Sequence, residues 1–285
     1  INAVKFKNIY IFGDSLHDTG NLKKLTDGEY PSNAYFEGRF SNGPVYCDYL
    51  VDTIFKKSGK RITIKNYAVG GALTSYKNGY SPKSTSLKSQ IESEKFVFDE
   101  KDLVIVGCGA NNYGFFVDIH QFPFIHLNRL YNLADDLESC VKKIIDQGAR
   151  NILLFNVPDM FMAPVKYKLS ILFRRLIVPF ISKSLLKTNK KIRSFVDGYK
   201  KEGVTLELFD AYKLFTEALN SPEKFGFKCS KKYIIPGLGR YDGKVSKLKE
   251  HDEYLFWDYV HPTTQGHKLL AQYIGKLINE KFHIE

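Results

Sequence analysis

Five short apolar runs recur along the chain, and stretches of helical periodicity separate most of them. A buried strand typically spans about four to eight residues rich in β-branched and aromatic side chains, and the five runs fit that description. Alternation of such strands with helices predicts an α/β fold, in which helices cover both faces of a parallel sheet. The predicted strands are Asn8–Phe12, Ile62–Tyr67, Leu103–Gly107, Asn151–Asn156 and Val204–Phe209.

Three segments place apolar residues on one face of a helix. Apolar positions from Leu127 to Ile145 predict a helix that ends before Gly148. Residues 43–57 predict a second helix, and Leu269–Ile278 predict a third near the end of the chain. In a parallel α/β sheet the ligand binds beyond the carboxyl ends of the strands. We therefore expect the functional residues just past the strand ends.

Two further segments do not fit a minimal α/β unit. Basic and large apolar residues interleave between 163 and 196, and Pro179 is expected to kink or divide any helix there. Residues 221–252 are rich in Gly, Lys and Pro and weakly periodic, which predicts a loop. We interpret residues 1–285 as a single domain with a basic amphipathic insertion at about 163–196 and a loop insertion at about 221–252.

The composition is that of a soluble globular protein. Of the 285 residues, 44% are hydrophobic and 26% are charged, and no apolar run approaches the roughly 18 residues of a membrane-spanning helix. The net charge of +11 favours polyanionic partners, such as nucleic acid or the anionic face of a membrane. No nucleic-acid-binding motif is recognisable, so we expect no nucleic-acid partner and interpret the charge as suited to an anionic membrane surface. We also expect the protein to be a monomer.

The chain begins with Ile1 in place of an initiator Met. This start is expected for the mature form of a secreted protein whose targeting peptide has been removed, although a trimmed chain would begin in the same way. In a secreted protein Cys229 could join a disulfide, whereas the apolar surroundings of Cys108 and Cys140 predict buried free thiols.

Neither the cysteines nor the histidines show the spacing of metal ligands. We therefore expect no metal and no cofactor. The residues considered are Cys47, Cys108, Cys140 and Cys229, with His17, His120, His126, His251 and His267.

The first predicted strand ends at Gly13-Asp14-Ser15-Leu16, which places a hydroxyl at the end of a buried strand. Near the other end of the chain, Asp258 and His261 supply a carboxylate and an imidazole three positions apart. In a nucleophilic triad His261 would take the proton of Ser15, and Asp258 would orient the imidazole. The alternative is that Asp14 and Ser15 cap a helix and that His261 precedes another.

Acyl transfer also needs hydrogen-bond donors that face the developing oxyanion. The backbone N–H of Ser15 can be one of them. Gly70 and Gly71 follow the second predicted strand, and glycine lets a backbone amide approach a substrate closely. Asn111 follows the third strand and brings a side-chain amide. Both segments are also compatible with ordinary turns.

Taken together, these motifs resemble the four sequence blocks of the GDSL (SGNH) hydrolases, and they occur in the order of that family. One departure is Asn112, which stands where the third block usually ends in Asp. The resemblance implies a flavodoxin-like three-layer α/β/α sandwich with a five-stranded parallel sheet, and ester hydrolysis without a metal. The four blocks are Gly13–Leu16, Gly70–Gly71, Gly109–Asn111 and Asp258–His261.

Carried over by position, the resemblance implies a triad of Ser15, His261 and Asp258. It also implies that Ser15, Gly71 and Asn111 donate to the oxyanion, with Gly70 close enough to compete with Gly71. Any substrate class remains open at this level, because one fold hosts many functions.

The segments Gly38–Gly43 and Asn66–Ala72 are similar to the lipolytic branch of the family. That branch includes bacterial secreted lysophospholipases A of the Legionella type and glycerophospholipid:cholesterol acyltransferases. The resemblance implies release of fatty acids from lysophospholipids or phospholipids through an acyl-enzyme on Ser15, with acyl transfer when an alcohol replaces water. The alternatives are a carbohydrate acetyl esterase and a non-catalytic membrane-binding protein on the same fold.

The basic segment at about 163–196 has two interpretations. An amphipathic element with basic and apolar residues can dock on anionic lipid, or it can line an acyl-chain groove. Alternatively, a pair of helices packs on the sheet and the charges are simply solvated.

Overall fold

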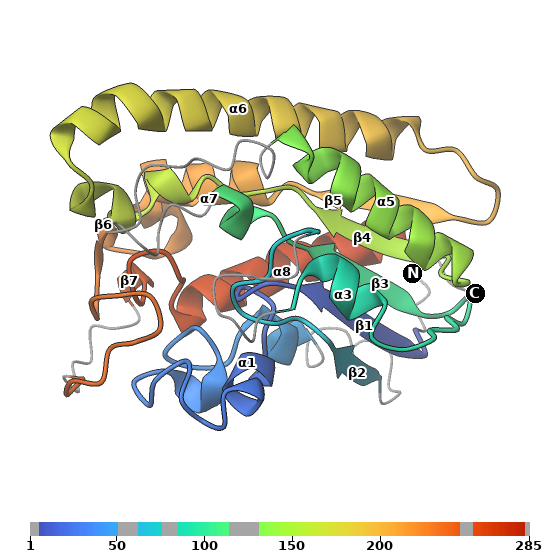
Figure 1. Cartoon of the computed structure of the whole chain (residues 1–285), viewed down its shortest axis with the longest axis horizontal. Coiled ribbons are helices and arrows are strands. Elements are labelled where there is room, and N and C mark those ends of the chain that lie inside the picture. The colour runs from blue at the N-terminus through green and yellow to red at the C-terminus, as the bar shows by residue number, and fades with distance from the viewer. Residues whose placement is uncertain (1–5, 51–61, 76–84, 114–130, 246–252, 283–285) are drawn as a thin grey trace.

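The central sheet has five parallel strands in the order β2-β1-β3-β4-β5 (Figure 1). The computed structural model describes residues 6–50, 62–75, 85–113, 131–245 and 253–282. The strands are β1 (Asn8–Gly13), β2 (Thr63–Asn66), β3 (Leu103–Gly107), β4 (Asn151–Phe155) and β5 (Thr205–Phe209). All five predicted strands are confirmed, each to within one residue at either end.

Helices cover both faces of the sheet, because successive side chains of a buried strand point to opposite faces. Phe12 and Val106 pack against one helical layer, whereas Ile11 and Ile105 pack against the other. The first layer contains α3 (Leu87–Ile91), α5 (Leu133–Asp146) and α6 (Ile171–Gly198). The second contains a helix described over residues 46–50, with α7 (Ala211–Asn220) and α8 (Thr264–Lys281). This is the expected three-layer α/β/α sandwich (Figure 1).

The described parts of the three predicted helices are helical. α5 and α8 present their periodic apolar residues to the two cores, and the helix at 46–50 lies within the predicted range 43–57. The predicted positions Leu127 and Leu130, and residues 51–57, lie outside the described residues.

Pro179 does not divide the basic segment, and the expected pair of helices is a single helix, α6, of 28 residues. Proline removes the hydrogen bond to the carbonyl four residues earlier, here that of Arg175. Arg175 and Pro179 are both exposed, so water can satisfy that carbonyl and the helix continues.

The segment at 221–252 was expected to be a loop, but its described part contains two short elements. Residues Pro222–Phe225 form the 3₁₀ helix η5, and Cys229–Tyr233 form strand β6. β6 pairs in parallel with β7 (Tyr254–Phe256), which leads directly to the Asp258–His261 motif. The small second sheet therefore anchors the approach to that motif.

The remaining short helices lie in the connections near the strand ends. They are α1 (Asn21–Leu25), η1 (Phe36–Gly38), η2 (Ala110–Tyr113), η3 (Met160–Met162) and η4 (Pro164–Lys168). Among the described helices, none combines the length and apolar character that crossing a bilayer requires.

Candidate active site

Ser15 lies in a tight turn at the carboxyl end of β1. The carbonyl of Asp14 accepts hydrogen bonds from the backbone N–H groups of His17 and Asp18, both at 3.0 Å. Gly13 must be glycine here, since a Cβ would lie 2.2 Å from the carbonyl oxygen of Gly107 on β3. The close approach of β1 and β3 thus fixes the start of the turn that carries Ser15.

The structure brings Ser15, His261 and Asp258 together. His261 Nε2 lies 2.9 Å from Ser15 Oγ, and His261 Nδ1 lies 2.7 Å from Asp258 Oδ2. With Nδ1 donating to the carboxylate, Nε2 is left to accept the serine proton. This arrangement can generate a serine nucleophile.

Asp258 is fully buried and its carboxylate accepts hydrogen bonds on both oxygens. Oδ1 accepts from the backbone N–H of Val260 at 2.9 Å and of His261 at 2.8 Å. Oδ2 accepts from the Tyr35 hydroxyl at 2.7 Å as well as from the His261 ring. Burial, together with the Asp258 charge, raises the pKa of Tyr35, so the hydroxyl keeps its proton and donates. Tyr35 is a residue that the sequence analysis missed.

Replacing Tyr35 by Phe is expected to lower kcat/KM about tenfold, because Asp258 loses a donor and the orientation it gives His261 loosens. The carboxylate without this donor attracts the imidazolium more strongly. The acid limb of the pH–kcat/KM profile should therefore move to higher pH. A drop in activity with an unchanged pH profile would assign Tyr35 a purely structural role.

A loop between η1 and residue 44 holds the Asp258–His261 segment in place. The Phe40 ring lies 4.9 Å from the His261 ring, centroid to centroid. Ser41 Oγ donates to the Pro262 carbonyl at 2.9 Å, and Asn42 Oδ1 accepts from the backbone N–H of Thr264 at 2.8 Å. The segment that resembles the lipolytic branch therefore positions the histidine.

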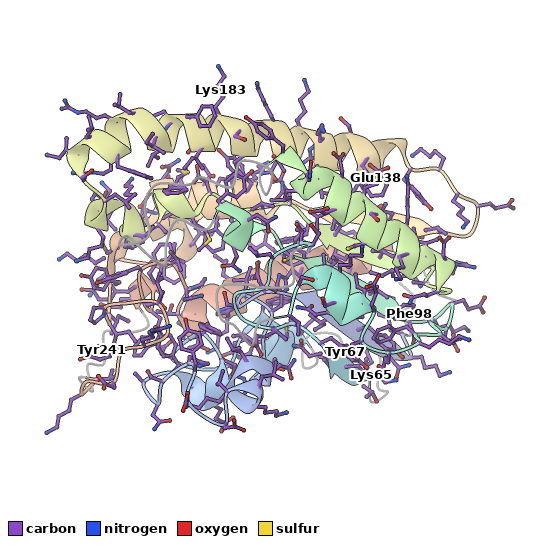
Figure 2. All side chains as sticks on the ribbon, in the orientation of Figure 1. Lys65, Tyr67, Phe98, Glu138, Lys183 and Tyr241 are labelled. Carbon is purple, nitrogen blue, oxygen red and sulfur yellow. The ribbon has the colours of Figure 1, made fainter. Side chains whose placement is uncertain are left out.

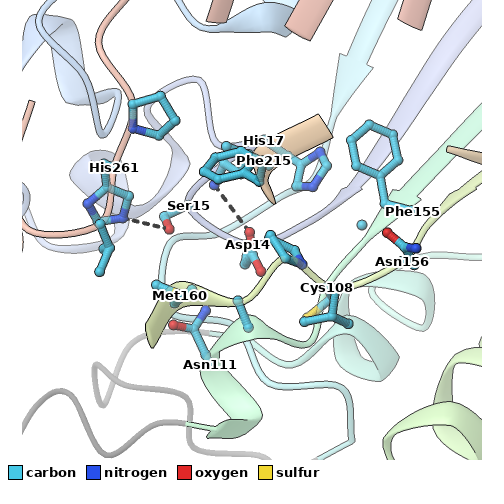
Figure 3. Close-up of a pocket in the computed structure, with 17 residues that line it drawn as sticks. Asp14, Ser15, His17, Cys108, Asn111, Phe155, Asn156, Met160, Phe215 and His261 are labelled. Atoms are coloured by element: carbon cyan, nitrogen blue, oxygen red, sulfur yellow. Dashed lines mark hydrogen bonds between the residues drawn. The ribbon is translucent and has the colours of Figure 1, made fainter. Parts of the chain in front are cut away.

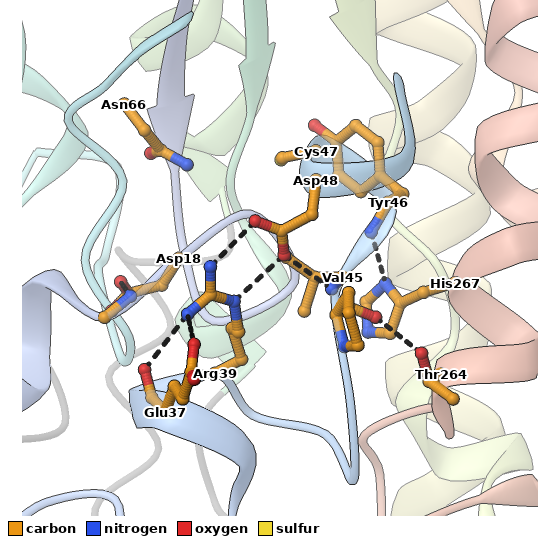
Figure 4. A network of polar contacts seen from close by, with 12 residues as sticks. Asp18, Glu37, Arg39, Val45, Tyr46, Cys47, Asp48, Asn66, Thr264 and His267 are labelled. Carbon is orange, nitrogen blue, oxygen red and sulfur yellow. Dashed lines mark hydrogen bonds and ion pairs between the residues drawn. The ribbon is translucent and has the colours of Figure 1, made fainter. Parts of the chain in front are cut away.

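This loop is fixed by a charged pair on its other side (Figure 4). Arg39 makes two hydrogen bonds to the Asp48 carboxylate, at 2.9 and 2.8 Å. Asp48 also accepts from the backbone N–H of Val45 at 2.9 Å. A planar guanidinium paired in this fork geometry restricts the loop more than a single contact would.

Asn111 lies in η2, past the end of β3, and lines the same pocket as Ser15 and His261. One of its amide hydrogens is donated to the carbonyl of Ala72 at 3.1 Å. A primary amide has two such hydrogens, and no described residue accepts the second, which leaves it for a ligand. Asn112, the departure from the family pattern, bonds the backbone and hydroxyl of Thr74 and ties η2 to the glycine segment.

The two glycines after β2 differ in their bonding. Gly70 N–H donates to the buried carboxylate of Asp18 at 2.8 Å. Gly71 has a φ of +79°, a conformation that suits glycine, and its N–H has no hydrogen-bond partner among the described residues. Gly71 is not one of the pocket-lining residues, but it precedes Ala72, which binds Asn111. Of the two amides, only that of Gly71 is without a partner among the described residues, and its role as an oxyanion donor stays a prediction.

Asp18 organises this side of the site without contacting Ser15. Besides Gly70, its carboxylate accepts from the backbone N–H groups of Gly20, Asn21 and Leu22. Burial raises the pKa of Asp18, and these four donors oppose that shift. The carboxylate thus caps α1 and ties it to the glycine segment, as a cap of this type does.

Ser15, His261 and Asn111 border an open cleft (Figure 3). Much of the remaining wall is apolar. Its residues come from the Ser15 turn, from η2, from β4 and the segment after it, from α7 and from the residues on either side of His261. The apolar members are Leu16, Ala110, Phe155, Val157, Pro158, Met160, Phe215, Val260 and Pro262. An apolar wall next to a nucleophile suits a substrate with a hydrocarbon part.

Two titratable groups are buried under the nucleophile. Burial raises the pKa of Asp14 to about 6, with the N–H of Leu16 and the charge of His261 opposing that shift. Burial lowers the pKa of His17 to about 3, so its ring is neutral. His17 Nδ1 bonds the Tyr46 hydroxyl at 2.5 Å, and the ring fills the space that the missing Cβ of Gly107 leaves open.

All four cysteines are free: Cys47, Cys108 and Cys140 are buried, and Cys229 is partly exposed. The predicted free thiols at Cys108 and Cys140 are confirmed, and the disulfide left open for Cys229 is not formed in this structure. No cluster of three or more His, Cys, Asp or Glu side chains able to hold a metal occurs in the described part of the chain. The predicted positions His120, His126 and His251 lie outside it.

The sheet topology and the serine–histidine–aspartate arrangement at its carboxyl edge define a class, the α/β ester hydrolases with a serine nucleophile. Within that class, the chain belongs to the GDSL-like lipase/acylhydrolase family, whose model matches residues 9–274. This confirms the resemblance seen in the sequence.

Three curated relatives are similar over nearly all of this chain. The phosphatidylcholine-sterol acyltransferase of Aeromonas hydrophila is 26% identical over 97% of this chain and 91% of its own length. The thermolabile hemolysin of Vibrio parahaemolyticus is 26% identical over 94% of this chain, and the secreted effector protein SseJ of Salmonella typhimurium is 30% identical over 97%. The chain spans 63% of the hemolysin and 65% of the effector.

Solved structures show the same fold at low identity. A catalytic mutant of an acetylxylan esterase from Geobacillus stearothermophilus matches with a TM-score of 0.54 at 14% identity, covering 97% of this chain and 95% of its own. A carbohydrate acetylesterase from Sinorhizobium meliloti matches with a TM-score of 0.53 at 14% identity, covering 97% of this chain and all of its own. At this identity the likeness concerns the fold and leaves the substrate undetermined.

Proposed function

We propose that this protein is a lipolytic ester hydrolase that releases fatty acids from lysophospholipids or phospholipids through an acyl-enzyme on Ser15. The observation that carries the proposal is the hydrogen-bonded chain Ser15–His261–Asp258 at the wall of a largely apolar cleft. A long acyl chain needs such a wall, whereas an acetyl group on a sugar does not.

The reaction proceeds in two steps, acylation of Ser15 and hydrolysis of the acyl-enzyme. Ser15 Oγ attacks the ester carbonyl while His261 Nε2 takes the serine proton, and Asp258 stabilises the imidazolium. The oxyanion is held by the N–H of Ser15, the free side-chain N–H of Asn111 and the N–H of Gly71. His261 then returns the proton to the departing alkoxide, which leaves as a lysophospholipid or, from a lysophospholipid substrate, as a glycerophosphodiester alcohol.

In the second step water replaces the alcohol. His261 takes a proton from water, the resulting hydroxide attacks the acyl-enzyme, and the fatty acid leaves as Ser15 recovers its proton. An acceptor alcohol in the place of water would receive the acyl group instead. The name of the Aeromonas relative, a phosphatidylcholine-sterol acyltransferase, supports this transfer as a second activity.

We also propose that the protein acts outside the bacterial cell, as a monomer. The names of two relatives, a hemolysin and a secreted effector, support an action beyond the producing cell.

The test is a substrate panel run with the wild-type chain, Ser15→Ala and Ser93→Ala. We expect fatty-acid release from palmitoyl lysophospholipid and phospholipid to exceed acetate release from acetylated xylan at least tenfold. Ser15→Ala should lose all measurable turnover, since the nucleophile is gone, and Ser93→Ala should keep it. If acetate were released as fast as the fatty acid or faster, the substrate would be an acetylated sugar and not a lipid. Full activity of Ser15→Ala would refute the mechanism.

A further inference from the structure

The first half of α6 is apolar on both its inner and its outer side. Its inner side, including Ile177 and Ile181, packs on α5 and the sheet. Its outer side carries Leu172, Leu176 and Phe180 at four-residue spacing, which places them on one face. A helix that is hydrophobic all round is normally buried in a core or in lipid. The outer side of α6 therefore calls for a partner.

This outer face is exposed in the structure. The exposed fractions are 69% for Leu172, 62% for Leu176 and 50% for Phe180. Ile171 and Leu186 are two further exposed apolar residues of α6, at 62% and 50%. Contiguous exposed apolar side chains of this kind mark interaction surfaces, whereas scattered single ones do not.

Positive charge borders the apolar face. Arg175, Lys183 and Lys187 are exposed on the same side of α6, and no described acidic group forms an ion pair with them. Figure 2 shows the Lys183 side chain pointing away from the body of the molecule. The sequence has no Asp or Glu between Asp159 and Asp197. A purely basic border matches a partner with negative charge and an apolar interior, which is the chemistry of an anionic bilayer.

α6 is also bonded to the wall of the active-site cleft. Asn189 on α6 brackets Val157, accepting from its N–H at 2.9 Å and donating to its carbonyl at 2.8 Å. Ser182 Oγ donates to Asp159 at 2.6 Å. Val157 lines the cleft beside Ser15, and so does Met160 just after Asp159. These hydrogen bonds fix the position of α6 relative to the cleft. A membrane bound to α6 would therefore lie in a defined position relative to Ser15.

We propose that the outer face of α6, formed by Leu172, Leu176 and Phe180 with Arg175, Lys183 and Lys187, docks the enzyme on anionic lipid bilayers. The apolar side chains enter the boundary between headgroups and acyl chains, and the three basic groups contact the lipid phosphates and carboxylates. Docking itself needs no catalysis. Its benefit for turnover rests on the lipolytic function proposed above.

The test measures binding of the full chain, inactivated by Ser15→Ala, to sedimented vesicles. Vesicles contain phosphatidylcholine alone or phosphatidylcholine mixed with phosphatidylserine, an anionic lipid that attracts basic surface segments. We expect at least tenfold stronger partitioning to the anionic vesicles at low salt, with most of that difference lost at high salt. The triple variants Arg175→Glu/Lys183→Glu/Lys187→Glu and Leu172→Gln/Leu176→Gln/Phe180→Gln should each lose at least tenfold.

Two matched variants control for charge and for exposed apolar area elsewhere. They are Lys24→Glu/Lys88→Glu/Lys95→Glu and Leu25→Gln/Val97→Gln/Tyr273→Gln, all at exposed positions outside α6. Both should bind as the parent does. Binding by the α6 variants equal to that of the parent, or the same loss in the controls, would overturn the docking surface.

A second readout separates docking from the chemistry. With an active Ser15, both α6 variants should hydrolyse a soluble short-chain ester at the parental rate but lose activity on vesicle lipid. Parental activity on vesicle lipid would overturn the coupling of docking to turnover. If no chain that retains Ser15 hydrolyses either ester, the proposed function is refuted, but the result of the binding experiment still stands.

Discussion

Replacement of Asp258 by Asn should lower kcat/KM on ester substrates about 10,000-fold with the fold intact. The Asn side chain would keep its oxygen toward the N–H groups of Val260 and His261, which both bond Oδ1. Its NH₂ would then face His261 Nδ1, which the carboxylate faces now at 2.7 Å. To accept from that NH₂, His261 must carry its proton on Nε2, and Nε2 can then no longer take the proton of Ser15.

The measurement compares kcat/KM of Asp258→Asn with that of Asp146→Asn, whose carboxylate lies at the exposed end of α5. The control should match the wild-type chain. The mechanism predicts loss in kcat without an equal rise in KM, because the altered tautomer affects the chemical step and leaves substrate binding alone. A loss below tenfold in a folded Asp258→Asn chain would remove Asp258 from the triad.

The second large effect is on stability in mild acid. Burial lowers the pKa of both His17 and His267 to about 3, and the charges of His261 and His17 add to the shift at His267. Above pH 6.5 both rings are neutral in the folded and the unfolded chain, so they add no pH dependence. Below pH 6.5 the two rings bind protons in the unfolded chain but not in the folded chain. The free energy of unfolding therefore falls as the pH is lowered.

The size of this effect follows from about 1.4 kcal/mol per pH unit for each group. Between pH 7 and pH 5 the two histidines should remove roughly 4 kcal/mol. Asp14 acts in the opposite sense, since its pKa is raised to about 6 and the folded chain takes up its proton first. Asp14 should therefore add about 1.4 kcal/mol of stability over the same interval, and the sum for these three groups alone is a loss of about 2–3 kcal/mol.

Urea unfolding at pH 7 and pH 5 measures these differences. His267→Asn keeps an acceptor for the N–H of Tyr46, which bonds His267 Nδ1 at 3.2 Å, and removes the ionisable ring. The drop between the two pH values should shrink by about 2 kcal/mol in His267→Asn and grow by about 1 kcal/mol in Asp14→Asn. Equal drops in all three chains would mean that neither group is buried as described.

The sheet could be predicted from the sequence because its information is local. A run such as Leu103–Gly107 is apolar at every position, fully buried, and bounded by polar or glycine residues. The parts that failed depend on non-local terms. Strand β6, with Lys231 and Lys232 exposed, has no apolar alternation and forms because β7 lies beside it. The helix through Pro179 persists because solvent reaches the freed carbonyl.

The candidate site divides in the same way. Ser15, Asp258 and His261 stood out because their residue types, taken together, match one chemistry. Tyr35 did not, since its contact with Asp258 spans 223 positions and tyrosine has many uses. Ser41 and Asn42 lay in a segment noted only for its resemblance, and their contacts with Pro262 and Thr264 appear only in the fold. Long-range positioning residues of this kind leave no local pattern.

The central claim is that His261 activates the Ser15 hydroxyl, and the direct measurement is covalent labelling by a fluorophosphonate followed by peptide mass spectrometry. The mechanism predicts one adduct, on Ser15, formed rapidly in the wild-type chain and at least a hundredfold more slowly in His261→Ala, because a serine without its base is a weak nucleophile. An unlabelled Ser15, or labelling that proceeds equally fast without His261, would contradict the account.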